Sequence, residues 1–99
     1  MTVRLGVSER VFQAGVVELA RLGGWRVYHA YDSRRSEAGW PDLAMCRGER
    51  LVCAELKSRT GRVRADQRAW MLALGRVAGV EVYLWREPAS WPEIREVLR

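Results

Sequence analysis

The sequence has little lysine, cysteine and histidine, and it has no long apolar run. No segment is apolar over enough residues to span a bilayer, and there is no signal peptide or lipidation signal, so we expect a cytoplasmic protein with no membrane partner. Cys46 and Cys53 lack C-x-x-C spacing, and the chain has a single histidine, His29, as a further potential zinc ligand. This scarcity argues against a zinc site and predicts two buried free thiols in a reducing compartment. Without repeats, low-complexity segments or linkers, residues 1–99 are expected to form one domain.

Lysine occurs once, at position 57, in a chain that otherwise takes its positive charge from sixteen arginines. If position 57 needed only a cation, arginine would serve there as it does elsewhere. An ammonium group is a compact point charge with an adjustable pKa, unlike a guanidinium group. The net charge of +5 favours a polyanionic partner such as nucleic acid, although an acidic protein or a membrane surface would be attracted as well. Lys57 is therefore a candidate for chemistry rather than for charge alone.

Hydrophobic spacing and turn residues predict an α/β domain. Three helices are expected: over residues 8–22 with Ser8 as N-cap, over residues 65–78, and from a capping box at Ser90 to about Leu98. Four strands are expected over residues 25–31, 43–46, 51–56 and 80–85. Elements in this order predict a mixed sheet with helices on its faces.

The predicted hairpin between the second and third strands brings two acids together. A two-residue turn at Gly48-Glu49 places Asp42 opposite Glu55, with Cβ atoms about 4.5–5.5 Å apart. Lys57, two residues further along the strand, shares their face of the sheet. Facing carboxylates repel unless a cation lies between them, and Mg²⁺ takes one or two carboxylates together with water and phosphate. A one-residue slip would reverse the faces, and the alternative is an ordinary cross-strand ion pair with Lys57.

These residues also carry a family resemblance. Pro41-Asp42, then Glu55-x-Lys57, then a helix opening with Gln67 resemble the PD-(D/E)XK nuclease superfamily. From Ser8 to about Trp85, the order of motifs resembles the stand-alone, phage-type VRR-NUC domain. The segments concerned are 32–36 (DSRRS), 39–43 (GWPDL), 54–58 (AELKS) and 66–70 (DQRAW). The chain has Arg64-Ala65 where relatives often carry a proline, which affects the start of the helix and not the chemistry.

The resemblance implies a restriction-endonuclease-like αβββαβ core, with a mixed central sheet between helices and a short C-terminal helix. It implies a structure-selective DNA endonuclease that requires Mg²⁺, with Mn²⁺ as a substitute and no small-molecule cofactor, in a bacterial or phage-infected cell. A Holliday-junction resolvase is the expected type, with branched or junction DNA as partner. A junction has two strands to cut, so a homodimer is expected. A flap or branched-DNA nuclease of the same family, a non-catalytic DNA-binding module and a small interaction domain remain alternatives.

The expected roles of the site residues follow from the hairpin register and from the family resemblance. Asp42 and Glu55 are expected to hold the metal, and the resemblance adds the backbone carbonyl of Leu56. Lys57 is expected to orient the attacking water and to neutralise charge as it develops. By its place on the helical wheel, Glu9 points inward beside Phe12, which favours a third metal ligand; the alternative is a favourable interaction with the helix dipole.

Further polar residues are candidates for contacts with substrate. Gln67 heads the apolar stripe of the second helix, and relatives place a glutamine there near the scissile phosphate or the lysine. The alternative for Gln67 is a rim residue bonded to backbone. Arginine forks match phosphate oxygens, and surface arginines that are only solvated are the alternative. The expected DNA-binding residues are Arg34 and Arg35 with Ser33 and Ser36 beside them, and Arg59, Arg62 and Arg64 in the loop after Lys57.

Overall fold

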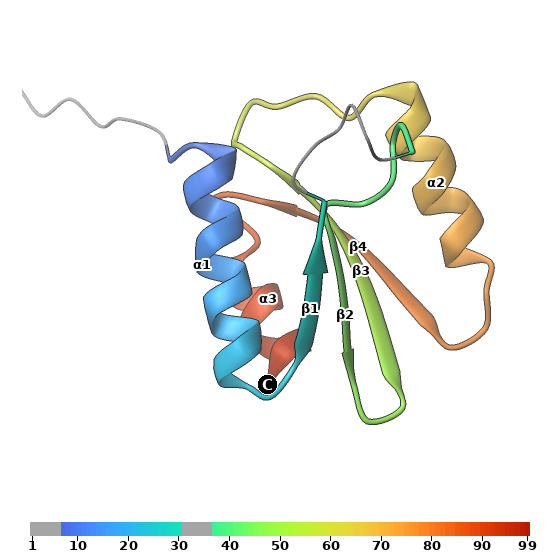
Figure 1. Ribbon diagram of the computed structural model, residues 1–99. Helices are drawn as coiled ribbons and strands as arrows, with labels where there is room; N and C mark the ends of the chain where they lie inside the picture. The colour runs from blue at the N-terminus through green and yellow to red at the C-terminus, as the bar shows by residue number, and fades with distance from the viewer. Residues whose placement is uncertain (1–6, 31–36) are drawn as a thin grey trace, which may run out of the picture.

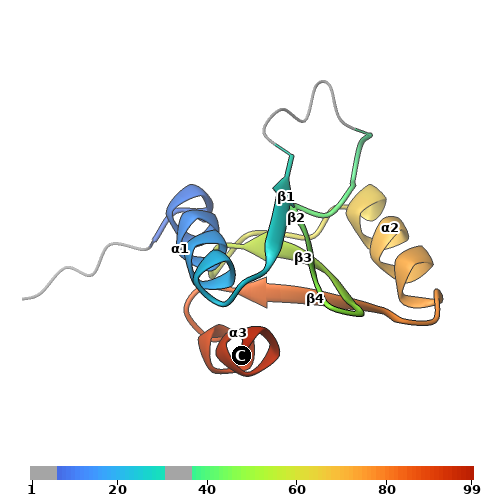
Figure 2. The same ribbon diagram turned by 60° about the horizontal axis from the view of Figure 1, so that its bottom comes forward.

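The computed structural model describes residues 7–30 and 37–99 of the chain. The elements in chain order are α1 (Glu9–Leu22), β1 (Arg26–His29), β2 (Leu43–Arg47), β3 (Arg50–Lys57), α2 (Ala65–Gly75), β4 (Val80–Arg86) and α3 (Trp91–Leu98). One four-stranded sheet lies at the centre, with α1 and α3 on one face and α2 on the other (Figure 1, Figure 2). The predicted αβββαβ order with a short C-terminal helix is confirmed. Within the two described ranges, no helix is long and apolar enough to cross a membrane.

The sheet is mixed, as predicted. Its strands lie in the order β1-β2-β3-β4, and neighbours are antiparallel except for the parallel pair β3–β4. The β2–β3 hairpin has the predicted register, with Leu43 opposite Ala54. Gly48, at a φ of +60°, supplies the left-handed residue that so short a turn needs. One step beyond Leu43, the same register brings Asp42 to the level of Glu55.

The core lies between the sheet and the two helices α1 and α3. On α1, Phe12, Val16 and Ala20 form the buried side, as the helical spacing predicts. Trp85 of β4 is fully buried, and its indole N–H donates to the Glu93 carboxylate of α3 at 3.0 Å. The other core residues are Val17, Trp25, Leu43, Met45, Val52, Ala54, Leu56, Ile94 and Leu98. Because β3 contributes three of these residues, its position in the sheet is fixed firmly.

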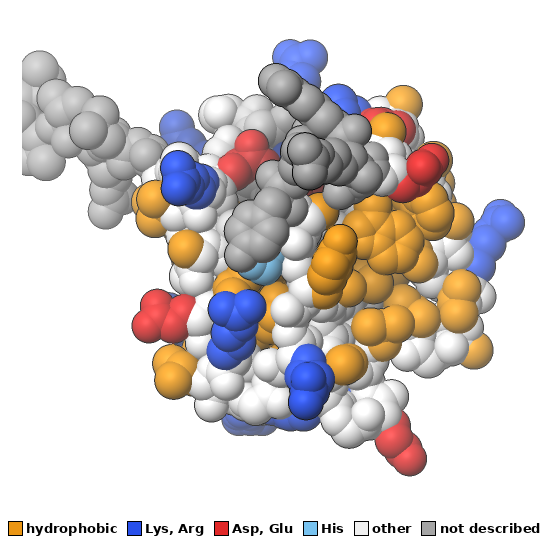
Figure 3. All heavy atoms as spheres, in the orientation of Figure 1, with side chains coloured by type: hydrophobic (Ala, Val, Ile, Leu, Met, Phe, Trp, Pro, Cys, Tyr) orange, Lys and Arg blue, Asp and Glu red, His pale blue; other side chains and the backbone are white. Residues whose placement is uncertain are grey.

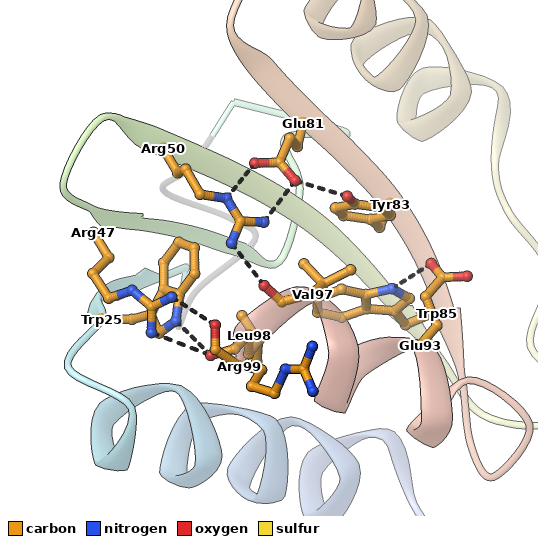
Figure 4. Close-up of polar contacts among 10 residues, drawn as sticks. All are labelled: Trp25, Arg47, Arg50, Glu81, Tyr83, Trp85, Glu93, Val97, Leu98 and Arg99. Carbon is orange, nitrogen blue, oxygen red and sulfur yellow. Dashed lines mark hydrogen bonds and ion pairs between the residues drawn. The ribbon is translucent and has the colours of Figure 1, made fainter.

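Two arginines at the closed end of the hairpin bind the C-terminal end of α3 (Figure 4). Arg47 and Arg50 face each other across the turn. Arg47 donates to the carbonyls of Leu98 and Arg99 at 3.3 and 2.7 Å. Arg50 donates to the carbonyl of Val97 at 2.9 Å. Cations are favourable at a helix C-terminus, where carbonyl groups lack helical partners.

Trp25 completes this anchor. The guanidinium groups of Arg47 and Arg50 lie 4.6 and 5.0 Å from the centre of its ring, and its indole N–H donates to the Leu98 carbonyl at 3.0 Å. Arg50 also forms two hydrogen bonds of 2.8 Å with Glu81, and these hold the pKa of Glu81 below its ordinary value. Both arginines therefore stabilise the fold.

The face of the sheet toward α2 is only partly covered. Gln67 is the one buried residue of α2, while Leu72 on α2 and Tyr28 on β1 are 65% and 62% exposed. Figure 3 shows hydrophobic side chains gathered between the sheet and α2. Both cysteines are free, but the prediction that both are buried is wrong at Cys46, which is exposed on this open face. Cys53 is buried, and burial raises the pKa of its thiol.

The ends of the second helix and of the strands differ from the prediction by a few residues. The second helix ends at Gly75 rather than at residue 78. The N–H of Val77 returns to the carbonyl of Leu74 at 3.0 Å, a three-residue closure that is common where a helix ends. The fourth strand continues to Arg86, one residue beyond the predicted end, and Arg86 pairs with Lys57 of β3.

The segment that leads into β2 lies tightly against α2. Gly39 has a φ of +88°, and a Cβ atom there would lie 2.5 Å from the carbonyl carbon and oxygen of Asp66. Trp70 of α2 donates to the carbonyl of Ala38 at 3.1 Å, and its ring meets Trp40 edge-on with 4.9 Å between ring centres. The first two turns of α2 thus hold the chain just before the acid pair.

We expect Gly39→Ala to lower the free energy of unfolding by more than Gly48→Ala does. Both glycines have positive φ, which costs a residue with a side chain about 1–2 kcal/mol. Only Gly39 would add an overlap with backbone atoms, because nothing lies within 4 Å of a Cβ at Gly48. Urea unfolding of the two variants measures the difference, which we expect to exceed about 1 kcal/mol. Equal losses would show that the segment does not depend on close approach to α2.

Candidate active site

Asp42 and Glu55 meet at one end of the β2–β3 pair. Asp42 follows Pro41 immediately before β2, and Glu55 lies near the end of β3. The Oδ2 atom of Asp42 accepts a hydrogen bond of 2.8 Å from the N–H of Leu56. The carboxyl groups of Asp42 and Glu55 are near enough to form a hydrogen bond with each other. The structure therefore brings the two predicted acids together.

Glu55 is buried in an environment that disfavours its charge. Its side chain is 1% exposed; Oε1 accepts a hydrogen bond from the Gln67 amide at 3.2 Å, and the buried Oε2 has no hydrogen-bond donor among the described residues. Burial raises the pKa of Glu55 to about 9; the hydrogen bond with Asp42 and its charge add to the rise, while Lys57 and Arg64 oppose it. Without a cation, the pair therefore retains a proton at neutral pH.

Lys57 lies beside the acid pair on a fixed stem. It is two residues beyond Glu55 on β3, so the two side chains leave the same face of the sheet. Lys57 is only 6% exposed, and its carbonyl accepts a hydrogen bond of 3.1 Å from the N–H of Glu87. The backbone of Gly61 packs along its side chain, since a Cβ at Gly61 would lie 3.4 Å from Cδ of Lys57. The ammonium group thus has little freedom to leave the site.

Gln67 connects α2 to the acid pair. Its amide oxygen accepts a hydrogen bond of 2.9 Å from the N–H of Arg64, which satisfies one backbone donor at the start of α2. Its amide nitrogen donates to Glu55. Gln67 therefore bonds to backbone, as expected for a rim residue, and it also contacts the acid pair, as expected for a residue of the active site.

The donor set fits a hard divalent cation. Two carboxylates at one point supply oxygen ligands, and the unpaired Oε2 atom of Glu55 is a buried polar atom that an ion would satisfy. Across residues 7–30 and 37–99, no group of three or more His, Cys, Asp or Glu side chains is placed to hold a metal ion. The site therefore offers two acids, and water or phosphate oxygens would complete the coordination.

Glu9 does not join this pair, which corrects the prediction that it faces inward. The residue is exposed in the first turn of α1, beside the N-cap Ser8, whose hydroxyl accepts from the N–H of Val11 at 3.2 Å. The buried side of α1 begins at Phe12. A helical wheel gives the direction of a side chain but not how far the core extends along the helix.

The predicted phosphate-binding residues have different settings. Ser33, Arg34, Arg35 and Ser36 lie outside the described residues. Arg64 lies at the start of α2 and forms an ion pair of 3.2 Å with Asp66. Its charge also lowers the pKa of Glu55, so Arg64 acts on the acid pair.

The structure adds Arg68 and Arg86, two arginines that were not among the predicted DNA-binding residues. Arg59 and Arg62 line an open pocket together with Arg68 of α2 and Arg86 of β4. Arg86 lies directly beside Lys57 in the β3–β4 register. The parallel pairing of these strands is the signal that would have found Arg86, and it is a contact between distant parts of the sequence.

We expect the stability of the metal-free protein to fall as pH rises. The pKa of Glu55 is raised to about 9 in the folded chain, from an ordinary value of 4.5 that applies to the unfolded chain. Between these pH values the folded state keeps a proton that the unfolded state has lost. The free energy of unfolding should decrease from about pH 4.5 to about pH 9 and then level off. Glu55→Gln, which cannot ionise, should flatten this slope and add roughly 1–3 kcal/mol at pH 8.

Urea unfolding in EDTA at several pH values measures this slope. Glu49→Gln, at the exposed hairpin turn, is the matched control and should keep the slope of the unaltered chain. An unchanged slope in Glu55→Gln would contradict the buried, protonated state of Glu55.

A search of solved structures finds that the fold is similar to that of Hjc, a Holliday junction resolvase from the archaeal hyperthermophile Archaeoglobus fulgidus. The two chains are 23% identical, and the match covers 80% of this chain and 68% of the other with a TM-score of 0.55. A scan against protein-family models and a search of curated proteins find no match. The mixed sheet flanked by helices, with a short C-terminal helix, is therefore a restriction-endonuclease-like fold, as predicted.

Proposed function

We propose that this protein is a metal-dependent, structure-selective DNA endonuclease of the Holliday-junction-resolvase type. We place it in the PD-(D/E)XK superfamily and its stand-alone VRR-NUC branch. The observation that carries the proposal is the buried carboxyl group of Glu55, which lies against Asp42 and beside Lys57 with one oxygen unpaired. The fold shared with an archaeal Holliday junction resolvase supports it.

Asp42 and Glu55 would hold Mg²⁺ or Mn²⁺, with the Leu56 carbonyl as a further ligand. Such an ion lowers the pKa of bound water and offsets negative charge on phosphate. The peptide N–H of Leu56 fixes the orientation of the Asp42 carboxylate, and the Gln67 amide fixes that of Glu55. The protein thus presents both acids in defined positions before substrate arrives, which is what efficient electrostatic stabilisation requires.

Lys57 would act on the water and on the phosphate. Hydrolysis forms a bond between phosphorus and the oxygen of water and breaks one phosphodiester P–O bond, while negative charge grows on the phosphate oxygens. The Lys57 ammonium, held by its buried stem, would orient the attacking water and neutralise part of that charge. Because its three N–H groups rotate, it can follow both oxygens through the reaction.

The proposed substrate is branched or junction DNA, bound by a homodimer. The net charge of +5 supports binding of a polyanion. Two strands related by a two-fold axis need two active sites, and each copy of the chain would supply one, at Asp42 and Glu55. Exposed apolar side chains on the open face of the sheet and on α2, such as Tyr28 and Leu72, supply surface that a second copy could cover.

We expect Asp42→Ala, Glu55→Ala and Lys57→Ala each to lower DNA cleavage in Mg²⁺ at least about 100-fold while DNA binding persists. The substrates are labelled four-way junctions, flaps and plain duplexes, and a plasmid that extrudes a cruciform. A dimer that cuts both strands should convert the cruciform plasmid directly to linear DNA. Glu49→Gln is the control and should cut as the unaltered chain does.

The outcomes separate the alternatives. Cleavage that survives in Asp42→Ala would remove the metal-site argument. Binding without cleavage in either Mg²⁺ or Mn²⁺ indicates a non-catalytic DNA-binding module, and neither binding nor cleavage indicates an interaction domain. Preferred cutting of flaps, with nicked circles from the cruciform plasmid, indicates a flap nuclease.

We expect metal binding to release about one proton at neutral pH, because the folded pair retains a proton up to a pKa of about 9 at Glu55. Calorimetric titration of Mn²⁺ at pH 7 in buffers with different ionisation enthalpies counts that proton. The affinity should rise about tenfold per pH unit below pH 9. Glu55→Gln should lose both the high affinity and the proton release. Binding without proton release would contradict ligation by Glu55.

A further inference from the structure

Four arginine side chains gather in one open pocket beside the acid pair, which we call the arginine pocket. Arg59 and Arg62 come from the loop after β3, Arg68 comes from α2, and Arg86 comes from the end of β4. The pocket has a volume of about 490 Å³. Its other lining residues are uncharged: Thr60, Gly61, Val63 and Leu84.

No acid balances the charge of the arginine pocket. In the described part of the chain, none of its four arginines forms an ion pair with a carboxylate. Three other arginines do, in the pairs Arg50–Glu81, Arg64–Asp66 and Arg99–Glu96. Like charges that line one small pocket repel one another. An anion bound in the pocket would attract each of the four arginines and offset that repulsion. Four guanidinium groups around a concave surface are suited to phosphate oxygens.

Arg86 links the arginine pocket to Lys57. It is the register partner of Lys57 across β3 and β4, so both side chains leave the same face of the sheet. Its Nη1 atom donates to the carbonyls of Gly61 and Ser58 at 2.6 and 3.2 Å. Gly61 in turn packs along the Lys57 side chain. The guanidinium group therefore holds the turn that confines the stem of the catalytic lysine.

We propose that the arginine pocket binds a phosphodiester group of the DNA strand that is cut, adjacent to the phosphodiester group that is hydrolysed. We also propose that Arg86 positions Lys57. This inference rests on the proposed function for the identity of the strand. The site and the pocket are neighbours because Lys57 of the site and Arg86 of the pocket are register partners. A phosphate held by Arg68 together with Arg59 and Arg62 would fix the register of the strand, so that the neighbouring phosphate meets the acid pair. Arg68 is a binding residue in this proposal, and Arg86 is a positioning residue.

The first test of the pocket measures anion binding without metal or cleavage. Pyrophosphate is titrated into the ¹⁵N-labelled protein, and the arginine Nε–Hε signals are followed by NMR. We expect saturable shifts of the four pocket arginines, with an affinity that Arg68→Gln lowers about tenfold and Arg76→Gln leaves unchanged. Arg76 is the matched control because it is exposed at the other end of α2. Shifts that spread equally over Arg76, or that Arg68→Gln does not weaken, would overturn the site.

The second test uses cleavage of junction DNA. Arg68→Gln should raise KM about tenfold at unchanged kcat and lower the slope of log affinity against log salt by about one. Arg86→Lys keeps the charge, but its nitrogen is one atom closer to the backbone than the Nη1 atom that donates to both carbonyls, so kcat should fall about tenfold with little change in KM. Substrates that offer an internal phosphodiester or only a terminal 5′-phosphate at this place identify the group that is bound, and equal binding of both would overturn the assignment to an internal phosphodiester.

These results separate the inference from the proposed function. Saturable pyrophosphate binding in a chain that does not cut DNA would refute the nuclease and keep the anion site. Cleavage with the same KM in Arg68→Gln and Arg76→Gln would refute the strand assignment and keep the nuclease. An unchanged kcat in Arg86→Lys, at a melting temperature equal to that of the unaltered protein, would refute the positioning role.

Discussion

The burial of the Glu55 carboxyl group against Asp42 is the constraint on which the site depends. A carboxylate that is 1% exposed, next to a second acid, is unfavourable when it is charged. A core optimised for stability alone would place an apolar side chain here. The chain instead places the Gln67 amide and the Lys57 ammonium group beside Glu55, and it leaves the Oε2 atom of Glu55 without a hydrogen-bond donor among the described residues. This arrangement is stable with a proton, and it becomes stable without one only when a cation replaces that proton.

Arginine has two separate uses in this protein. At the closed end of the hairpin, Arg47 and Arg50 stack on Trp25 and bind the carbonyls at the end of α3, so their charge is taken up by the fold (Figure 4). At the opposite end of β3, the arginines of the pocket have no acid partners among the described residues. The sheet therefore separates structural charge from charge that remains free for a ligand. Composition alone does not reveal this division, because both sets contribute equally to the net charge.

The parts that the sequence predicted depend on short-range rules. Strand periodicity of two residues and a glycine in a two-residue turn set the β2–β3 register, and this register brought Asp42 to Glu55. Helical spacing placed Phe12 and Val16 in the core but did not show that the core ends before Glu9.

The parts that the sequence did not predict depend on distant contacts. Arg86 reaches Lys57 only because β4 lies parallel to β3, and Cys46 is exposed because α2 leaves part of its face of the sheet uncovered. Docking of α2 itself relies little on apolar burial, since Gln67 is its only buried residue. The helix is held by Gln67 at Glu55, by Trp70 at Ala38 and by the close approach of Gly39. Each of these contacts lies at or next to the acid pair, so a shift of α2 would alter the site and the arginine pocket together. Binding of a strand at Arg68 would therefore favour the same position of α2 that keeps Glu55 oriented for the proposed cation.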